Sequence, residues 1–216
     1  MTKKWTEEQI IEDLKNKILS GELEENNRLS EREVCEMYNV SRSTVRIVFS
    51  HLKEERWVYV KPQSGTYIAP IDVKTINNLF QLRQLLEPQL LIWNINNFTD
   101  DDIERMKKNC EIMSTRTGIV YEYAELDNHS TIKERTDNPI VVDLLNNMVQ
   151  NILRITSKTS VREERRKQAI YEWGTIVNCI ERRDADTASK YMLMHLINTA
   201  DEFWKNYGIL HNSKEE

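Results

Sequence analysis

The sequence predicts a mainly α-helical protein, in which three short helices and a β-hairpin precede an antiparallel bundle of about six to seven helices. Three observations favour this fold class. Capping residues followed by apolar residues at helical spacing recur along most of the chain, the strand-like runs are confined to residues 57–68, and Ala69-Pro70 interrupts the pattern before it resumes. With 216 residues and 39% hydrophobic content, the chain can form two domains, which we expect at residues 1–70 and 71–216.

The first predicted helix begins after Thr6. Thr6 with Gln9 three residues later is typical of a capping box, in which each residue satisfies a free backbone N–H of the other. Apolar residues then recur at helical spacing until Gly21, where we expect the helix to end. These residues are Ile10, Leu14 and Ile18.

Two more short helices follow, joined by a tight turn. Ser30 with Glu33 predicts a second capping box, and Ser41 predicts the cap of a third helix. Asn39 tolerates the left-handed backbone that such a turn requires. The apolar residues of these two helices are Val34, Met37, Tyr38, Val45, Val48, Phe49 and Leu52.

A β-hairpin is predicted next. The aromatic and β-branched run Trp57–Val60 is separated from Thr66–Ile68 by the turn residues Pro62–Gly65. Three helices followed by a hairpin form a winged helix-turn-helix, in which the hairpin is the wing.

The rest of the chain is predicted to be helical. Apolar residues from Ile76 to Leu86 form a wide stripe, and Thr99 before Asp100–Asp102 marks a further helix start, with negative charge at the positive end of the helix dipole. Asp137–Pro139 breaks the pattern. Helical stretches follow at Ile140–Ile155, Ile170–Ile180 and Ala185–Trp204. Short connections between them favour an antiparallel bundle.

Composition limits the partners and the compartment. The net charge of −5 gives no global attraction to nucleic acid, but basic residues outnumber acidic ones between Arg42 and Lys61. Cys35, Cys110 and Cys179 match neither a disulfide framework nor a paired zinc motif. The sequence has no signal peptide and no apolar run of about 20 residues. We therefore expect a cytoplasmic protein that does not bind membranes.

The third helix has the residues of a DNA-reading helix. Such a helix places its N-terminus in the major groove. Arg42 and Arg46 are four residues apart and share a face, where a guanidinium can pair with guanine or hold a phosphate. Ser41, Ser43 and Thr44 can donate to phosphates beside the helix N-terminus. The alternative is that both arginines are only the solvated face of a helix that packs through its apolar side.

Four segments resemble the DNA-binding domain of GntR-family regulators. They are Ile18–Leu23, Leu29–Val34, Val40–Arg46 and Gly65–Ile68. The resemblance implies that the protein binds double-stranded operator DNA as a homodimer. It also implies that Arg32, Arg42, Thr44 and Arg46 contact DNA, with Gly65 at the wing tip. The chain departs from the family at Glu24–Asn27, where a Pro-Gly turn is usual, and at Trp57, where Gly is common.

The second domain resembles the FadR-like subfamily of that family, whose C-terminal FCD-type domain is an all-helical ligand-binding bundle. Leu82–Pro88 is similar to its first helix. In many such proteins one Asp and three His bind a divalent metal such as Zn, Ni or Mn, which helps to bind a carboxylate effector. Here Glu125 and His129 lie four residues apart on one helix face, and His195 could join them.

Two departures put that metal in question. Trp173 stands where the family carries a fourth ligand, a His, and Glu125 replaces the usual Asp, which moves the carboxylate by about 1.5 Å. The alternative is that His129 and His195 line a metal-free pocket in which Trp173 offers an apolar wall to the effector. Arg83 would then bind the effector's carboxylate, or would only form a salt bridge to Glu87.

Three functions are compatible with these features. The first is a ligand-responsive transcriptional regulator, a repressor or an activator, that senses a small organic acid or a related metabolite through Arg83, Glu125, His129, Trp173 and His195. The second is a DNA-binding dimer without an effector. The third is a metal-dependent hydrolase using Glu125, His129 and His195, which would leave the first domain unexplained. We therefore do not expect an enzyme.

Overall fold

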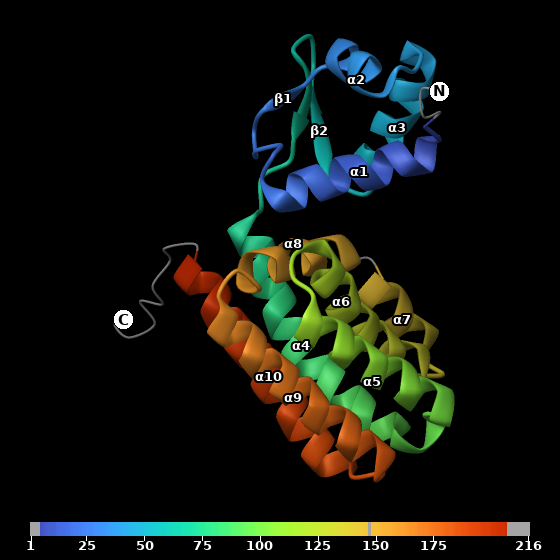
Figure 1. The fold of residues 1–216 in the computed structure, drawn as a ribbon, viewed down its shortest axis with the longest axis vertical. Helices are drawn as coiled ribbons and strands as arrows, with labels where there is room; N and C mark the ends of the chain where they lie inside the picture. Colours follow the sequence, from blue (N-terminus) through green and yellow to red (C-terminus); the bar gives the residue numbers. More distant parts are fainter. Residues whose placement is uncertain (1–4, 147, 207–216) are drawn as a thin grey trace. The chain divides into compact units, whose positions relative to one another are not determined.

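The computed structural model describes residues 5–146 and 148–206. The chain divides into two compact units, Met1–Asp72 and Val73–Glu216 (Figure 1). The first unit contains helices and a small sheet, and the second contains helices in its described part. The mainly α-helical class predicted from the sequence is confirmed.

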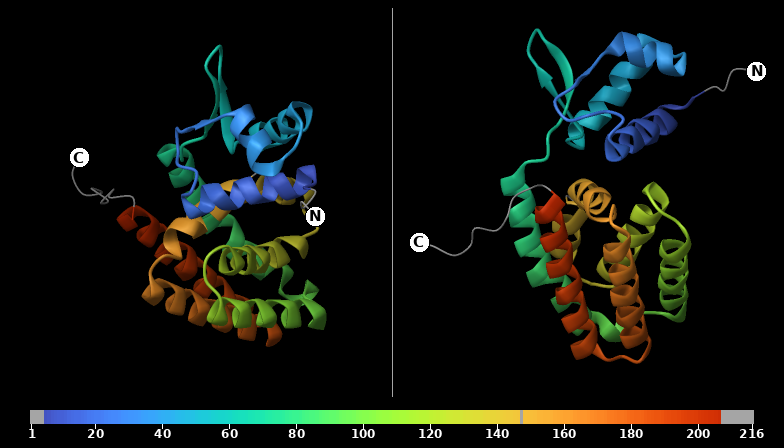
Figure 2. Two further views of the ribbon diagram at one scale, coloured as in Figure 1. Left: turned by 45° about the horizontal axis from the view of Figure 1, so that its top comes forward. Right: turned by 60° about the vertical axis from the view of Figure 1, so that its left-hand side comes forward.

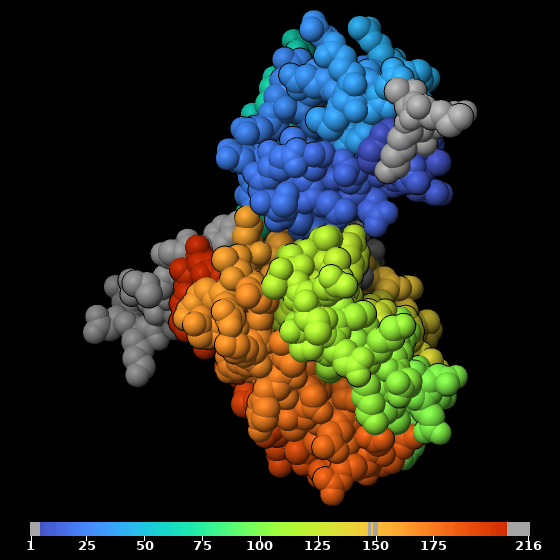
Figure 3. All heavy atoms as spheres, viewed as in Figure 1, coloured from blue at the N-terminus to red at the C-terminus, as the bar shows by residue number. Residues whose placement is uncertain are grey.

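Three helices form the body of the first unit: α1 (Glu7–Ser20), α2 (Glu31–Tyr38) and α3 (Arg42–Glu54). The predicted capping box between Thr6 and Gln9 is formed, and α1 ends at Gly21, whose φ is 81°. Asn39 takes the left-handed conformation after α2, with φ 51°. The helices bury the apolar side chains that the spacing singled out, except Met37, which is 49% exposed. Figure 3 shows side chains of α1 and α2 on the face of this unit that is turned toward the viewer.

One predicted cap is wrong. Ser30 occupies the N-cap position of α2 and has the extended backbone of a cap, but its side chain accepts no hydrogen bond from the helix. Ser30 directly follows a strand whose residue Leu29 is buried and paired with Thr66. Strand pairing therefore sets the backbone direction at this helix start. By contrast, Ser41 caps α3 as predicted, accepting from the Thr44 N–H.

The wing is a three-stranded antiparallel sheet with the order β1-β3-β2. The predicted hairpin is formed by β2 (Val58–Lys61) and β3 (Gly65–Ile68), which projects from the helices in both views of Figure 2. Trp57, predicted as a strand residue, lies just before β2 and is buried. The third strand, β1 (Arg28–Leu29), pairs with β3. Two residues are too few to show an alternating pattern, so the sequence did not predict it.

Seven helices make up the described part of the second unit. They are α4 (Val73–Asn94), α5 (Asp100–Thr115), α6 (Ile119–Glu134), α7 (Pro139–Asn146), α8 (Val149–Thr159), α9 (Glu163–Glu181) and α10 (Ala185–Asn206), with a 3-10 turn at Ile95–Asn97. Helix α10 packs between α4 and α9, and α5 packs between α6 and α9 (Figure 2). The helix start at Thr99 is confirmed, since Thr99 and Asp102 form a capping box.

The helix predicted at Ile140–Ile155 is instead two helices, α7 and α8, and residue 147 between them lies outside the described residues. The Asn138 side chain accepts from the N–H groups of Ile140 and Val141, which fixes the start of α7 at Pro139. The apolar pattern runs across the junction because both helices bury one side. Periodicity alone therefore did not separate them.

Helix α4 contains a proline. Pro88 lies inside the helix and is buried, directly after the buried Glu87. Its neighbours Leu90 and Leu91 belong to the main apolar core of this unit, together with Trp173 and Leu196.

None of the helices in the described ranges combines the length and the apolarity that crossing a bilayer requires.

Candidate functional site

The N-terminus of α3 gathers three hydroxyl groups. Ser41 Oγ lies 2.7 Å from Ser43 Oγ and 3.1 Å from Thr44 Oγ1, and it accepts the Thr44 backbone N–H at 3.2 Å. Ser41 and Ser43 are exposed and Thr44 is half-buried. This end of the helix therefore offers hydrogen-bond donors and the positive end of the helix dipole to an anion.

Arg42 and Arg46 are exposed on the same helix. Arg46 donates through Nε to Glu31 Oε1 at 3.1 Å, and its side chain is 69% exposed. Arg42 has no ion pair or hydrogen bond with any residue in 5–146 or 148–206. Because α3 is anchored through the buried Val45, Val48 and Phe49, both guanidinium groups point into solvent. They can therefore meet a partner without first leaving a buried position.

Arg32 and the wing tip complete the predicted DNA-reading set. Arg32 on α2 is exposed and pairs with Glu36, one turn later, at 2.9 Å. Gly65 opens β3 with φ 120°, a backbone conformation that side chains other than hydrogen rarely allow. The tip residue Gln63 has φ 61°. Positive φ at both positions produces the sharp turn of the wing.

In the second unit, Glu125, His129 and His195 come together inside the bundle. Each residue offers one ligand atom, these atoms lie within 4.8 Å of one another, and all three residues are buried. His195 Nε2 is 3.4 Å from Glu125 Oε1. The structure therefore brings together the three residues that the sequence proposed as a group.

Two carboxylates that were not predicted to contact the histidines orient both rings. His129 donates through Nδ1 to Glu87 Oε2 at 2.6 Å, and His195 donates through Nδ1 to Glu172 Oε2 at 2.8 Å. Both carboxylates are buried. A carboxylate on Nδ1 fixes the ring and leaves Nε2 for another partner, as the outer partners of metal-bound histidines do.

Each histidine also has a buried arginine beside it. Arg83 donates through Nε to Glu87 at 2.5 Å, and its Nη2 lies 3.0 and 3.3 Å from the two ring nitrogens of His129. Since both distances are short, the guanidinium lies over the ring. Arg165 donates to Glu172 at 3.0 Å and to Thr199 Oγ1 at 2.9 Å. The Arg83–Glu87 salt bridge, one of the two roles considered for Arg83, is thus formed.

We call these seven residues the polar centre: Arg83, Glu87, Glu125, His129, Arg165, Glu172 and His195.

Burial and pairing shift the pKa values of the polar centre. Burial opposes the charge of Glu87, but Arg83 and His129 outweigh it and lower the pKa of this carboxyl. Burial lowers the pKa of His129, and Arg83 adds to this effect. For His195 burial acts in the same direction, but hydrogen bonds to Glu125 and Glu172 outweigh it and raise the pKa. His129 is therefore favoured as neutral imidazole and His195 as imidazolium.

Trp173 packs beside both imidazoles, whose own ring centroids are 5.4 Å apart. Its ring centroid is 4.7 Å from that of His129 and 5.2 Å from that of His195. The side chain is fully buried, and its Nε1 has no hydrogen-bond partner among the residues that the structure describes. Trp173 therefore contributes an apolar ring to the polar centre, together with one donor that an added acceptor could use.

The donor set fits a divalent metal. Two imidazole nitrogens and one carboxylate oxygen suit zinc and other first-row ions, and Glu87 and Glu172 supply the outer carboxylates. Three protein ligands leave a position for a further ligand. Glu125, His129 and His195 could therefore hold a metal ion.

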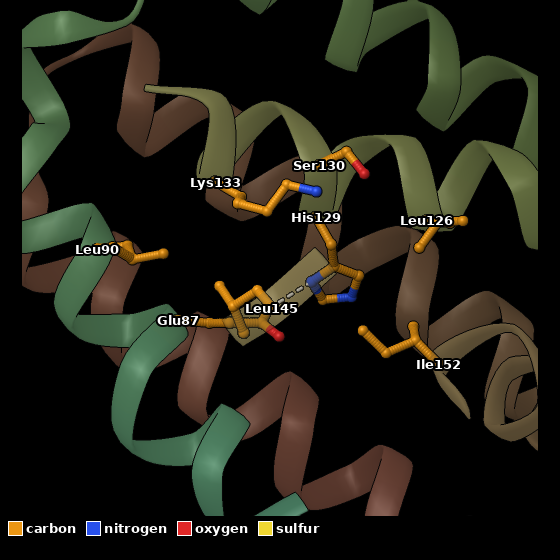
Figure 4. A pocket seen from close by; sticks show the side chains of 8 residues that line it. All are labelled: Glu87, Leu90, Leu126, His129, Ser130, Lys133, Leu145 and Ile152. Atoms are coloured by element: carbon orange, nitrogen blue, oxygen red, sulfur yellow. Dashed lines mark hydrogen bonds and ion pairs between the residues drawn. The ribbon is translucent and has the colours of Figure 1, made fainter. Parts of the chain in front are cut away.

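A small hollow adjoins the polar centre at His129. Figure 4 shows Glu87 and His129 joined by a hydrogen bond at one side of it, with Ser130 and Lys133 farther along the same helix as His129. The Lys133 amine donates to Asn146 Oδ1 at 2.6 Å. The remaining lining residues are Leu90, Leu126, Leu145 and Ile152. The hollow thus has mainly apolar walls and one cationic side chain.

The sequence contained signals for some of the polar-centre residues that were not predicted as site residues. Glu87 was named only as a salt-bridge partner of Arg83, and its spacing of four from Arg83 predicted that pair. Glu172 precedes Trp173 in an otherwise apolar helix face, which is a signal of a buried acid. Arg165 lies in the basic run Arg162–Lys167, where its neighbours are more exposed. Nothing in that run distinguishes the one buried arginine.

Comparison with protein families matches both units. Residues 6–68 match the model described as "Bacterial regulatory proteins, gntR family", and residues 78–198 match the FCD domain.

Known proteins are similar over most of the chain. The HTH-type transcriptional repressor RspR of Escherichia coli K12 is 23% identical over 193 residues, which cover 88% of this chain and 85% of RspR. The HTH-type transcriptional repressor NanR of Enterobacter sp. strain 638 is 26% identical over 231 residues, covering 96% of this chain and 88% of NanR.

Solved structures share the fold. E. coli McbR/YncC superposes with a TM-score of 0.72 at 15% identity, covering 93% of this chain and 98% of that one. A transcriptional regulator GntR from Rhodococcus sp. RHA1 gives a TM-score of 0.71 at 18% identity, covering 95% and 99%.

Proposed function

We propose that this chain, which belongs to the GntR family of bacterial regulatory proteins and carries an FCD domain, is a homodimeric repressor whose hold on its operator is controlled by a small organic anion. The family makes it a DNA-binding transcriptional regulator and not an enzyme. Repression is inferred from RspR and NanR, which are both named repressors. That the chain forms a dimer and that it responds to an effector are proposed here in addition to these family properties.

One observation carries the DNA-reading part: the capped N-terminus of α3 presents two exposed guanidinium groups. We assign Arg42 and Arg46 to base edges or phosphates, with Ser41, Ser43 and Thr44 on phosphates at the helix N-terminus. Arg32 reaches the same groove from α2, and Gly65 lets the wing tip approach the backbone closely. A dimer would place two such helices on successive half-sites.

The polar centre supports the effector part. A bundle core that needed only stability would be apolar, because isolated charges are costly to bury. Here two arginines, three carboxylates and two imidazoles lie together beside a hollow. We propose that the effector's anionic group is held by Arg83 and by His195, while its apolar part lies against Trp173 and the hollow.

As an alternative to direct contact with His195, a divalent ion held by Glu125, His129 and a neutral His195 would supply a fixed positive charge for the effector's carboxylate. Glu87 and Glu172 hold the two imidazoles in the orientation that such an ion needs. In this proposal the protein contributes the three ligands and their outer carboxylates, and Trp173 lies beside the imidazoles without binding the ion.

Thermal unfolding with added ligands tests the effector. An effector that binds the folded unit raises the melting temperature, and the same compound should weaken operator binding. The compounds are short carboxylates, hydroxy acids, sugar acids and amino acids, and the operator is selected from fragments of the host genome. A stabilising compound should lose its effect in Arg83→Gln but keep it in Arg116→Gln, an exposed arginine in the same unit. If no compound changes either quantity, the effector-independent dimer is the better description.

Metal binding has a separate test. Protein purified without chelator is titrated with Zn²⁺, Ni²⁺ or Mn²⁺ and its melting temperature is recorded. We expect stabilisation that His195→Ala abolishes and that Trp173→His increases, because the added imidazole would complete a four-ligand set. Equal responses in wild type and His195→Ala would show that the ion binds elsewhere.

A further inference from the structure

Helix α3 turns one aliphatic side chain outward. The side of the helix that packs into the first unit carries the buried residues Val45, Val48, Phe49 and Leu52. At 3.6 residues per turn, the positions opposite this side, all of them exposed, are held by Ser43, Ile47, Ser50 and Glu54. We call these four residues the outward row. Ile47 lies in its middle and is 44% exposed.

Ile47 is the apolar member of a polar row. Ser43 Oγ lies 2.7 Å from Ser41 Oγ at the helix N-terminus, and Ser50 donates to Glu54 at 3.4 Å. A protein-binding patch needs several contiguous apolar side chains, whereas Ile47 is one side chain among polar neighbours. A β-branched residue also stabilises an exposed helix less than alanine or lysine would, because its side chain loses rotamer freedom. Neither helix stability nor a protein-binding patch therefore explains isoleucine at this position.

The major groove of DNA presents one methyl group to a side chain, the C5-methyl of thymine. The other groups that identify a base there are hydrogen-bond donors and acceptors, which an aliphatic side chain would desolvate without pairing. Arg46 directly precedes Ile47 and is assigned to this groove under the proposed function. When α3 lies in the groove, the outward row is the side of the helix that meets the base edges.

We propose that Ile47 reads a thymine in each operator half-site by packing its side chain against the C5-methyl group of that base. The inference rests on the proposed function, because it requires that α3 lies in the major groove. It adds the identity of one base to that function. A cytosine at the same place presents an amino group and no methyl, so the contact favours a T·A pair over a C·G pair.

Removing single methyl groups from the DNA tests this contact. The operator is selected from genomic fragments, and in each half-site one thymine at a time is replaced by deoxyuridine, which lacks only the C5-methyl group. The full-length wild-type chain is titrated with each duplex at fixed salt concentration. We expect one of these replacements to weaken binding by about three- to five-fold per half-site, because one buried methyl group is lost.

Variants of Ile47 show whether this side chain senses the methyl group. Ile47→Ala removes the branched side chain from an exposed position and should bind the thymine and the deoxyuridine duplex equally well. Ile47→Val, which keeps a branched side chain, should retain most of the difference. Circular dichroism verifies the fold of each variant.

Ile197→Ala provides the matched control. Ile197 lies on α10 in the second unit and is 42% exposed, so the control makes the same substitution at nearly the same exposure. We expect it to leave the full difference between the thymine and the deoxyuridine duplex.

The outcomes separate this inference from the proposed function. Equal binding of the wild type to every deoxyuridine duplex, or a methyl effect that persists in Ile47→Ala, would overturn the assignment of Ile47. An operator preference that depends on Arg42 would remain in either case. A selection that enriches no genomic fragment would overturn the proposed function, and this inference with it.

Discussion

Two arginine–glutamate pairs with the same spacing differ only in their surroundings. Arg32 and Glu36 lie four residues apart on α2, with side chains 79% and 65% exposed. Arg83 and Glu87 lie four residues apart on α4, with side chains 2% and 6% exposed. The first pair is screened by water and can exchange partners at little cost. The second has lost its hydration, so each charge depends on the other.

This difference in exposure fits the functions proposed for the two units, which are DNA binding and effector binding. A DNA-reading surface needs guanidinium groups that can leave an internal partner for a base or a phosphate. A small-molecule site needs charges that are already fixed before the ligand arrives. Under the proposed function, the same residue types serve recognition of a large polyanion in one unit and binding of a small anion in the other.

Breaking the buried pair should have the largest effect. Arg83→Met removes the guanidinium and leaves the buried Glu87 carboxylate paired with His129 alone among the described residues, so we expect the free energy of unfolding to fall by about 3 to 5 kcal/mol. Urea denaturation followed by circular dichroism measures this change. A loss below about 1 kcal/mol would mean that the pair is not the constraint we describe.

Glu122, a buried acid with no ion pair among the described residues, extends this comparison. Burial, with the nearby Glu125, raises the pKa of Glu122 to about 7. The unfolded chain releases this proton at lower pH than the folded one, so stability is lost as pH rises from about 4.5 to 7 and stays lost above. Glu122→Gln should therefore stabilise the protein by about 1 to 3 kcal/mol at pH 8 and by little at pH 4. Melting temperatures across this pH range test it, and a pH-independent difference would contradict it.

Removing an exposed guanidinium should alter recognition more than folding. Arg42→Ala is expected to reduce discrimination between the operator and single-base variants by about 1 to 3 kcal/mol at the base pair it reads. Binding titrations at fixed salt measure this quantity. Equal loss on every duplex would identify Arg42 as a phosphate contact instead.

The smallest expected effect is on the stability of the exposed pair. Arg32→Met should change the free energy of unfolding by no more than about 0.5 kcal/mol, while weakening operator binding. Arg32→Met and Arg83→Met make the same substitution at an exposed and at a buried position, so their losses of unfolding free energy can be compared directly. Comparable losses in both variants would remove the distinction drawn above.

Local chemistry made much of the first unit predictable. The caps at Thr6 and Ser41, the left-handed Asn39 and the hairpin each depend on residues within a few positions of one another. Strand β1 was missed because its two residues gain their structure from pairing with β3, more than 35 residues later in the chain.

The polar centre was only partly predictable for the same reason. Glu125 and His129 share a helix, so their spacing revealed them, and His195 entered through the family resemblance. Glu172 and Arg165 become members only because α9 packs against α10. A sequence shows which acids exist, but the packing of helices determines which of them lose contact with water.

Pro88 removes one backbone hydrogen bond from α4. Because proline has no N–H, the carbonyl of Gln84 has no helical donor four residues later, and the ring crowds the preceding turn. The turn of α4 that lacks this hydrogen bond also carries Glu87, the carboxylate that accepts from His129. Helix α4 thus gives up one backbone hydrogen bond in the same turn that carries a buried acid of the polar centre.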